Sequence, residues 1–259
     1  MCQRHYVLSL LEYCGMLACK PFAIPMLPNL HLHNNYGTPI ADPAIYRRLI
    51  GRLLYLTISR PDICYIVHKL SQFVSKPYTE HMADVNLLLR YLKHTPGQGI
   101  LFKSTSDCNV HAYVDADWGS YMDTHRSTTG FCIFLGNSLV SWKAKRQKTV
   151  SKSSAEAEYR PLASVSIEIV WLKNFLTDFH ISTPHVVIYY DNQVTVQITS
   201  NPSHHERPKH PNIDLHFVRE HVEKGTVKLN HIRKHHQFTD ILTKSLPRTS
   251  FLSISPRWA

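Results

Sequence analysis

Apolar residues in the first third of the chain recur every three or four positions, the spacing of helices that bury one face. The apolar stripes lie in residues 46–57, 63–73 and 81–93, with Asp42-Pro43 ahead of the first and Pro77 after the second. An Asp followed by Pro is a typical helix start, and a later Pro a typical helix end. These patterns predict a mainly helical region over residues 1 to about 95.

From about residue 100 the pattern changes to that of strands. The predicted strands are residues 110–117, 130–135, 138–142 and 186–190. The first alternates between apolar and polar positions, as a strand with one buried face does. Gly136-Asn137 joins the second and third, and such pairs favour tight hairpin turns. The fourth is apolar throughout, which is typical of a strand buried on both faces.

Helices are predicted between and after these strands. They comprise a long helix after Ser153, helices around 192–199 and 210–223, and a short one near 238–244, with a last strand at 226–232. Strands that first form a meander and then alternate with helices indicate an α/β fold. We therefore expect a mixed five-stranded sheet flanked by helices.

The charge of the chain favours a polyanionic partner. Its 29 Lys and Arg against 19 Asp and Glu give a formal net charge of +10, with 18 histidines counted as neutral. Each cation placed at a phosphate releases condensed counterions, which favours nucleic-acid binding. One basic stretch lies next to Trp142 and contains Lys143, Lys145, Arg146, Lys148 and Lys152. We expect it to hold phosphates; a solvated basic hairpin rim is the alternative.

Membrane insertion and secretion are not expected from this sequence. No apolar run approaches the ~20 residues that a membrane span requires. The first residues lack the apolar core and cleavage site of a secretory signal. Six scattered cysteines without a Cys-x-x-Cys pair are typical of reduced thiols. We expect an intracellular protein, cytoplasmic or nuclear.

Four carboxylates are candidates for the chemistry. Glu158 falls on the apolar stripe of the long helix, where a carboxylate is costly unless it is paired or binds a metal. Asp191 directly follows a buried strand, and Asp115 lies on an alternating strand that also carries Asp117. Asp240 begins the last short helix. Acids at the ends of separate elements of one sheet can form an oxygen-rich cage for two Mg²⁺ ions.

Each acid also has a simpler interpretation. Glu158 could reach water at the rim of the helix, and Asp191 could cap the helix that follows it. Asp117 shares the polar face of Asp115 and could take its place. Pattern alone does not choose between these interpretations.

Several ordered motifs resemble the ribonuclease H domain of copia-type retrotransposon Pol polyproteins. They are YVDADW at 113–118, RSTTG at 126–130, SWK at 141–143, SSAEAEY at 153–159, YDN at 190–192, residues 209–220 and DILTK at 240–244. Upstream, residues 15–21, 46–57, 60–62 and 91–93 resemble the segment that follows the polymerase palm in the same polyproteins. The resemblance covers nearly the whole chain, to about Pro247.

The resemblance implies a specific site and substrate. The catalytic and metal-binding residues would be Asp115, Glu158, Asp191 and Asp240, holding two Mg²⁺ ions that Mn²⁺ can replace. His235, with His236 as the alternative, would help to move protons or release product. The substrate would be an RNA–DNA hybrid, recognised by its shape and backbone.

The same resemblance implies how the chain is divided. Residues 1–106 would be a remnant of the C-terminal thumb or connection region of a reverse transcriptase. Residues 107–247 would form the ribonuclease H-like domain, and residues 248–259 a tail outside the family. The remainder of a Pol polyprotein is then a further possible partner. No polymerase active site is present, since Ala116 stands where Tyr-x-Asp-Asp has its second acid.

Pro161 departs from the expected pattern. It lies in the helix three residues after Glu158, where it removes a backbone hydrogen bond at a cost of roughly 3 kcal/mol unless the helix kinks. A kink could displace Glu158, and a displacement of ~1 Å can cost ~100-fold in rate. An inactive relic that only binds nucleic acid is therefore the main competing interpretation.

The residues alone leave two further interpretations open. An integrase-like nuclease would need the acids in the order Asp-Asp-Glu, whereas this chain has Asp-Glu-Asp-Asp. A zinc site could use His231 with His235, or His204 with His205, although no thiol pair accompanies them.

Overall fold

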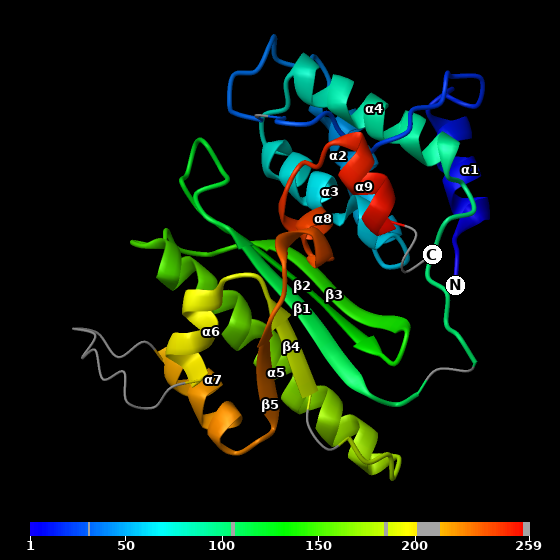
Figure 1. Ribbon diagram of the computed structural model, residues 1–259. Helices are drawn as coiled ribbons and strands as arrows, with labels where there is room; N and C mark the ends of the chain where they lie inside the picture. Colours follow the sequence, from blue (N-terminus) through cyan, green and yellow to red (C-terminus); the bar gives the residue numbers. More distant parts are fainter. Residues whose placement is uncertain (31, 105–106, 184–185, 201–212, 256–259) are drawn as a thin grey trace. The chain divides into compact units, whose positions relative to one another are not determined.

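The computed structural model describes residues 1–30, 32–104, 107–183, 186–200 and 213–255, which form two compact units (Figure 1). The helical unit contains Met1–Leu101, Tyr121–His125 and the described residues from Lys244 onward. The sheet unit contains Phe102–Ser120 and Arg126–Thr243. The predicted boundary after residue 106 thus lies within the sheet unit, and two later segments return to the helical unit.

Five α-helices and two 3₁₀ turns form the described part of the helical unit. They are α1 (Arg4–Tyr13), α2 (Pro43–Leu56), η1 (Pro61–Ile63), α3 (Cys64–Leu70), η2 (Ser71–Phe73), α4 (Thr79–His94) and α9 (Arg248–Ile254). Asp42 caps α2, because its Oδ1 accepts a 2.9 Å hydrogen bond from the Ala44 N–H. The helices predicted from the apolar stripes are confirmed; the middle stripe forms α3 with a 3₁₀ turn at each end.

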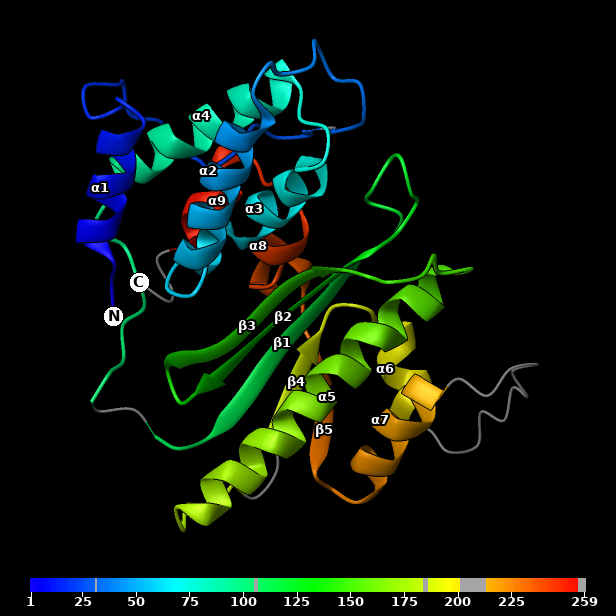
Figure 2. The same cartoon turned by 180° about the vertical axis from the view of Figure 1, so that it is seen from behind.

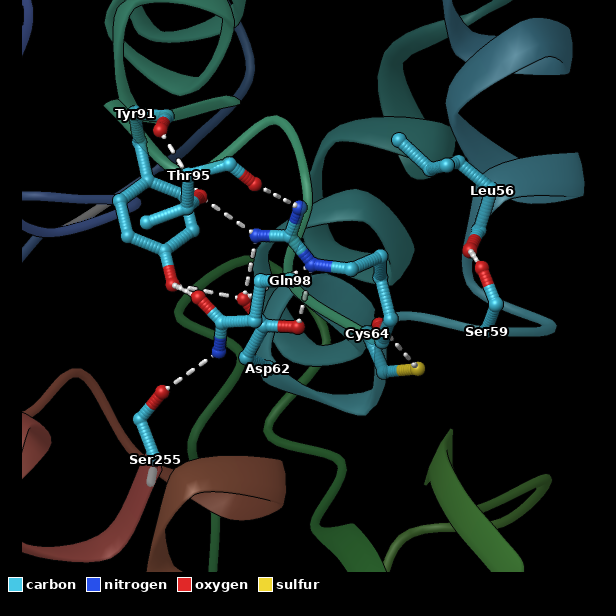
Figure 3. A network of polar contacts seen from close by, with 9 residues as sticks. Leu56, Ser59, Asp62, Cys64, Tyr91, Thr95, Gln98 and Ser255 are labelled. Carbon is cyan, nitrogen blue, oxygen red and sulfur yellow. Dashed lines mark hydrogen bonds and ion pairs between the residues drawn. The ribbon is translucent and has the colours of Figure 1, made fainter. Parts of the chain in front are cut away.

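A buried ion pair fixes the centre of the helical unit (Figure 3). Arg60 and Asp62 are each 1% exposed, and their side chains approach to 2.7 Å. The Tyr91 hydroxyl donates to Asp62 at 2.6 Å, and Arg60 donates to the Thr95 carbonyl at 2.9 Å. Because each charge has hydrogen-bond partners besides the other, the pair is satisfied rather than merely buried.

The C-terminal segment completes this network. The Phe251 ring of α9 packs edge-on against Tyr91 at 5.7 Å, and Gln98 donates to the Ser255 hydroxyl at 2.9 Å. Phe251 and Ile254 are buried. Helix α9, which lies within the residues that the sequence sets apart as a tail, therefore packs against the core of the helical unit through its buried face.

Asp84 on α4 is an unusual carboxylate in the same unit. Its Oδ2 atom is buried and has no hydrogen-bond partner among the described residues. Burial, and then the nearby charge of Glu80, raises the pKa of Asp84 to about 6. The charged form is therefore less stable in the folded state than in the unfolded chain.

We predict that Asp84→Asn stabilises the protein by about 1 kcal/mol at about pH 7, an amount that allows for partial exposure of the group. Because the pKa of Asp84 is raised on folding, the parent loses stability as the pH rises from about 4 to about 6. The gain in the variant should therefore vanish near pH 4. Urea unfolding of both proteins across this range measures it, and an equal difference at both pH values would contradict the assignment.

The sheet unit contains β1 (Val110–Asp117), β2 (Thr128–Leu135), β3 (Ser138–Arg146), β4 (Val186–Tyr190) and β5 (Val227–His231). Their order is β3-β2-β1-β4-β5. β1 pairs antiparallel with β2 and parallel with β4, β2 pairs antiparallel with β3, and β4 pairs parallel with β5. The mixed five-stranded sheet that the ribonuclease H resemblance predicts is confirmed. So is the tight β2–β3 turn, where Gly136 has φ 55°.

The helices of the sheet unit pack against its strands. They are α5 (Ser154–Asp178), α6 (Gln193–Ser200), α7 (Ile213–Glu223) and α8 (Asp240–Thr243), with a 3₁₀ turn η3 (Lys234–His236). Figure 2 shows α5 and α7 on the same face of the strands. Leu162, Val165 and Ile169 of α5 pack there with Ile188 of β4 and Val218 of α7. Residues 210–212, predicted to be helical, lie outside the described residues.

None of the helices in the described residues combines the length and apolar character needed to cross a membrane.

Candidate active site

The strand order brings two of the predicted acids to the same edge of the sheet. β1 and β4 run parallel, so their carboxyl ends lie together. Asp115 is near the end of β1 and is 3% exposed, while Asp191 directly follows β4. The ends of parallel strands are where open α/β sheets place their ligands.

The buried Tyr190, at the end of β4, is influenced by Glu158 as well as by these two acids. Its side chain is buried, and its pKa is raised well above the usual value by burial and then by the charges of Glu158, Asp115 and Asp191. These three carboxylates therefore lie within electrostatic range of one buried hydroxyl. Tyr190 belongs to the YDN motif, but the sequence assigns it no role, because it reads as one more apolar strand residue.

Glu158 is held by the segment that follows β4. Its Oε2 accepts hydrogen bonds from Asn192 Nδ2 at 2.5 Å and from Thr195 Oγ1 at 2.6 Å. The carboxylate is thus half-buried and bonded, in contrast to a side chain that reaches only water. Asn192 also caps α6, since its Oδ1 accepts from the Thr195 N–H at 3.1 Å. The capping role considered for Asp191 belongs to Asn192.

Asp240 begins α8, and α8 packs against β1 beside Asp115. Asp240 is 8% exposed, and one turn later the Thr243 hydroxyl donates to Asp115 Oδ2. Just ahead of α8, Gln237 Nε2 donates to the Val114 carbonyl at 2.7 Å. Both bonds fix α8 against β1 at Asp115. Thr243 lies within the DILTK motif, but no local pattern indicates that it would bind an acid 128 residues earlier.

Gly130 permits the close approach of α8. It pairs with Asp115 across the β1–β2 ladder. A Cβ atom at Gly130 would overlap the Thr243 methyl group and would lie 3.3 Å from Leu242 Cβ. The RSTTG motif therefore has a steric role, because its glycine leaves room for the residue that binds Asp115.

We predict that Gly130→Ala destabilises the protein by about 1–3 kcal/mol, since α8 must move away from the sheet. Gly51→Ala is the matched control. Gly51 lies within α2 with open space at its Cβ position, so the same substitution should stabilise by about 0.5–1 kcal/mol. Urea unfolding of the three proteins measures both effects. Equal stability of Gly130→Ala and the parent would show that α8 has no steric need for this glycine.

His235 and His236 both lie exposed on η3, with ring centroids 4.1 Å apart. Neither is placed among the acids by a hydrogen bond in the described structure. His231 donates from Nε2 to the Asp191 carbonyl at 3.2 Å. His204 and His205 lie outside the described residues.

The oxygen donors at this edge fit a hard divalent cation, because Mg²⁺ prefers carboxylates and water. The charges of three carboxylates act on Tyr190, and the buried Asp115 gains from a counter-charge. Within the described parts of the chain, however, no three His, Cys, Asp or Glu side chains are already arranged as a metal site. The zinc interpretation therefore gains no support among those residues.

The basic stretch gathers around one cavity of the sheet unit. The cavity has a volume of about 240 Å³ and is lined by Thr129, Lys143, Lys145, Arg146, Gln147, Lys148, Thr149, Arg160 and Ser164. Lys143 donates to Ser164 at 3.2 Å, and its pKa is lowered by burial and then by Lys145. An anion in the cavity would relieve that repulsion. Lys152, predicted with this group, is exposed and does not line the cavity.

Comparison with known proteins places this chain in a family. The chain is 42% identical to the Retrovirus-related Pol polyprotein from transposon RE1 of Arabidopsis thaliana, over 98% of the chain. It is 32% identical to the corresponding polyprotein of transposon TNT 1-94 of Nicotiana tabacum, over 96% of the chain. The chain belongs to the copia-type retrotransposon Pol family. No family model matches it.

The chain spans only 18% and 19% of the lengths of these two polyproteins. The RE1 match leaves about 2% of the chain uncovered, fewer residues than the predicted 248–259 tail contains. Among solved structures, LC11-RNase H1 isolated from compost has a TM-score of 0.38 and 14% identity, over 52% of this chain and 93% of that one.

Proposed function

We propose that the sheet unit is a ribonuclease H that hydrolyses the RNA strand of RNA–DNA hybrids during reverse transcription. The observation that carries the proposal is the placement of Asp115 and Asp191 at the carboxyl ends of the paired strands β1 and β4, with Glu158 bonded to Asn192, the residue after Asp191. Carboxylates are brought together at such a cost when they bind cations or transfer protons. Membership of the Pol family supplies the substrate class.

In this proposal Asp115, Glu158, Asp191 and Asp240 hold two Mg²⁺ ions. When bound, such ions lower the pKa of the attacking water and stabilise the leaving 3′ oxygen, giving 5′ phosphate and 3′ hydroxyl ends.

The protein's own contribution is orientation. Asn192 and Thr195 fix one oxygen of Glu158, which leaves its Oε1 atom to face a ligand. Thr243 fixes Oδ2 of the buried Asp115 in the same way. Carboxylates held by such neighbours lose less entropy when they bind a cation. His235 or His236, exposed on η3, would carry protons between the site and water.

The cavity between β3 and α5 would hold the backbone of the hybrid. Four cations of the basic stretch line it, and cations at a hybrid contact phosphates rather than bases. This role requires no sequence preference, as expected of an enzyme that must act along a whole transcript.

The second candidate function is a catalytically inactive protein that only binds nucleic acid. Pro161 inside α5, three residues after Glu158, favours it, while the intact acids favour the enzyme. Cleavage discriminates between the two.

We predict that the purified chain cleaves a labelled RNA–DNA hybrid in Mg²⁺ or Mn²⁺ and that EDTA stops it. Asp115→Asn should lower the rate at least ~100-fold, because it removes a metal-binding charge. Asp117→Asn, on the same strand, is the matched control and should retain most of the activity. Hybrid binding without cleavage by the folded parent would establish the inactive protein. Equal losses of activity in the two variants would contradict a specific metal-binding role for Asp115.

We also predict that Lys145→Gln weakens binding to the hybrid and lowers the slope of log K against log [salt] by about 1. Lys228→Gln changes a lysine that is also exposed, on β5 at the opposite edge of the sheet, and should leave the slope unchanged. Fluorescence anisotropy at several salt concentrations measures both. Equal slopes for the two variants would show that the cavity is not part of the binding surface.

A further inference from the structure

Pro161 lies inside α5, and the helix nevertheless continues from Ser154 to Asp178. In an α-helix the N–H of residue 161 would bond to the carbonyl of Ala157, but proline has no N–H. Ala157 is fully buried, so water does not reach its carbonyl to replace that bond. The segment that carries Glu158 therefore requires a hydrogen-bond donor from elsewhere in the protein.

Gln147 supplies this donor. It directly follows β3, is 7% exposed, and donates from Nε2 to the Ala157 carbonyl at 2.9 Å. The same amide nitrogen also donates to Thr129 Oγ1 at 3.3 Å.

The opposite end of the amide fixes its orientation. Gln147 Oε1 accepts from Arg160 at 3.0 Å and from the Ser151 hydroxyl at 2.9 Å. A guanidinium can only donate, so Oε1 must face Arg160 and Nε2 must face the Ala157 carbonyl. Arg160 is itself held by Glu156 at 2.6 Å. The donor is thus held rigidly by both the strand and the helix.

We propose that Gln147 is a positioning residue for Glu158, and this inference rests on the proposed ribonuclease activity. Ala157 immediately precedes Glu158, and its carbonyl is the group that Pro161 leaves without a helical partner. By binding that carbonyl, Gln147 keeps the first turns of α5 regular on either side of Glu158. The Glu158 carboxylate then meets Asn192 and Thr195 in the orientation that the site uses.

The test is a double-mutant cycle in the full chain. Gln147→Met keeps the length of the side chain but removes the donor. It should lower kcat for hybrid cleavage by ~10- to 100-fold with KM nearly unchanged, since a displacement of ~1 Å costs that much. In the Pro161→Ala background, the new N–H binds the Ala157 carbonyl, so the same change should cost less than about 3-fold.

Gln147→Glu tests the bond that Nε2 donates to Ala157 separately from the bonds that Oε1 accepts. A glutamate still accepts from Arg160 and Ser151 but has no N–H for Ala157, so it should lower kcat as Gln147→Met does. Parent-like activity of Gln147→Glu would overturn the proposal. So would equal losses from Gln147→Met in both backgrounds, or a loss confined to KM, because Gln147 lines the basic cavity and could instead touch substrate.

Urea unfolding of the parent, Gln147→Met, Pro161→Ala and the double variant gives a readout that needs no activity. Coupling between positions 147 and 161 in the free energy of unfolding is expected, and additivity would show that no bond is replaced. An inactive parent would refute the proposed function, and the positioning role with it. An active parent without coupling would refute the positioning role alone.

Discussion

Parallel pairing between β1 and β4 is the constraint on which the candidate site depends. The two strands are far apart in the sequence, and only their hydrogen bonding makes Asp115 and Asp191 neighbours at one edge. Helix α5, which connects β3 to β4, must pack on the sheet, and this brings Glu158 to the same edge. β1 also pairs with β2, which sets Gly130 opposite Asp115 and so defines where α8 can lie.

The arrangement places like charges around a buried hydroxyl, which opposes folding. Every hydroxyl and amide that contacts these acids offsets part of that cost. Thr243 donates a hydrogen bond to Asp115, while Asn192 and Thr195 donate to Glu158. In each case one carboxylate oxygen is bonded to the protein. The architecture is that of a site in which fixed neighbours, rather than flexible ones, determine where each acid points.

Much of the fold could be predicted from the sequence, because periodicity reports burial directly. The alternation in residues 110–117 and the apolar run at 186–190 predict two strands at their observed bounds. The stripe through the long helix places Glu158 toward the sheet. These signals are local, and each strand or helix carries its own.

The contacts that orient the acids have no such signal. Gln147 and Ala157, or Thr243 and Asp115, meet only after the chain has folded, and a threonine or glutamine in isolation reads as ordinary polar surface. The proline in α5 suggests a kinked helix when only its neighbours are considered, because the replacement donor comes from a residue outside that helix. The spacing of Phe251 and Ile254 is apolar, yet the sequence does not show that Tyr91 is the partner of Phe251.

The helical unit is assembled from both ends of the chain, and this has a consequence for its synthesis. Tyr91 and Gln98 emerge from the ribosome about 160 residues before Phe251 and Ser255, which complete their surroundings. During that interval the surface that α9 will cover is open to chaperones and to other nascent chains. Helices α1 to α4 therefore reach their full native packing only once α9 has been made.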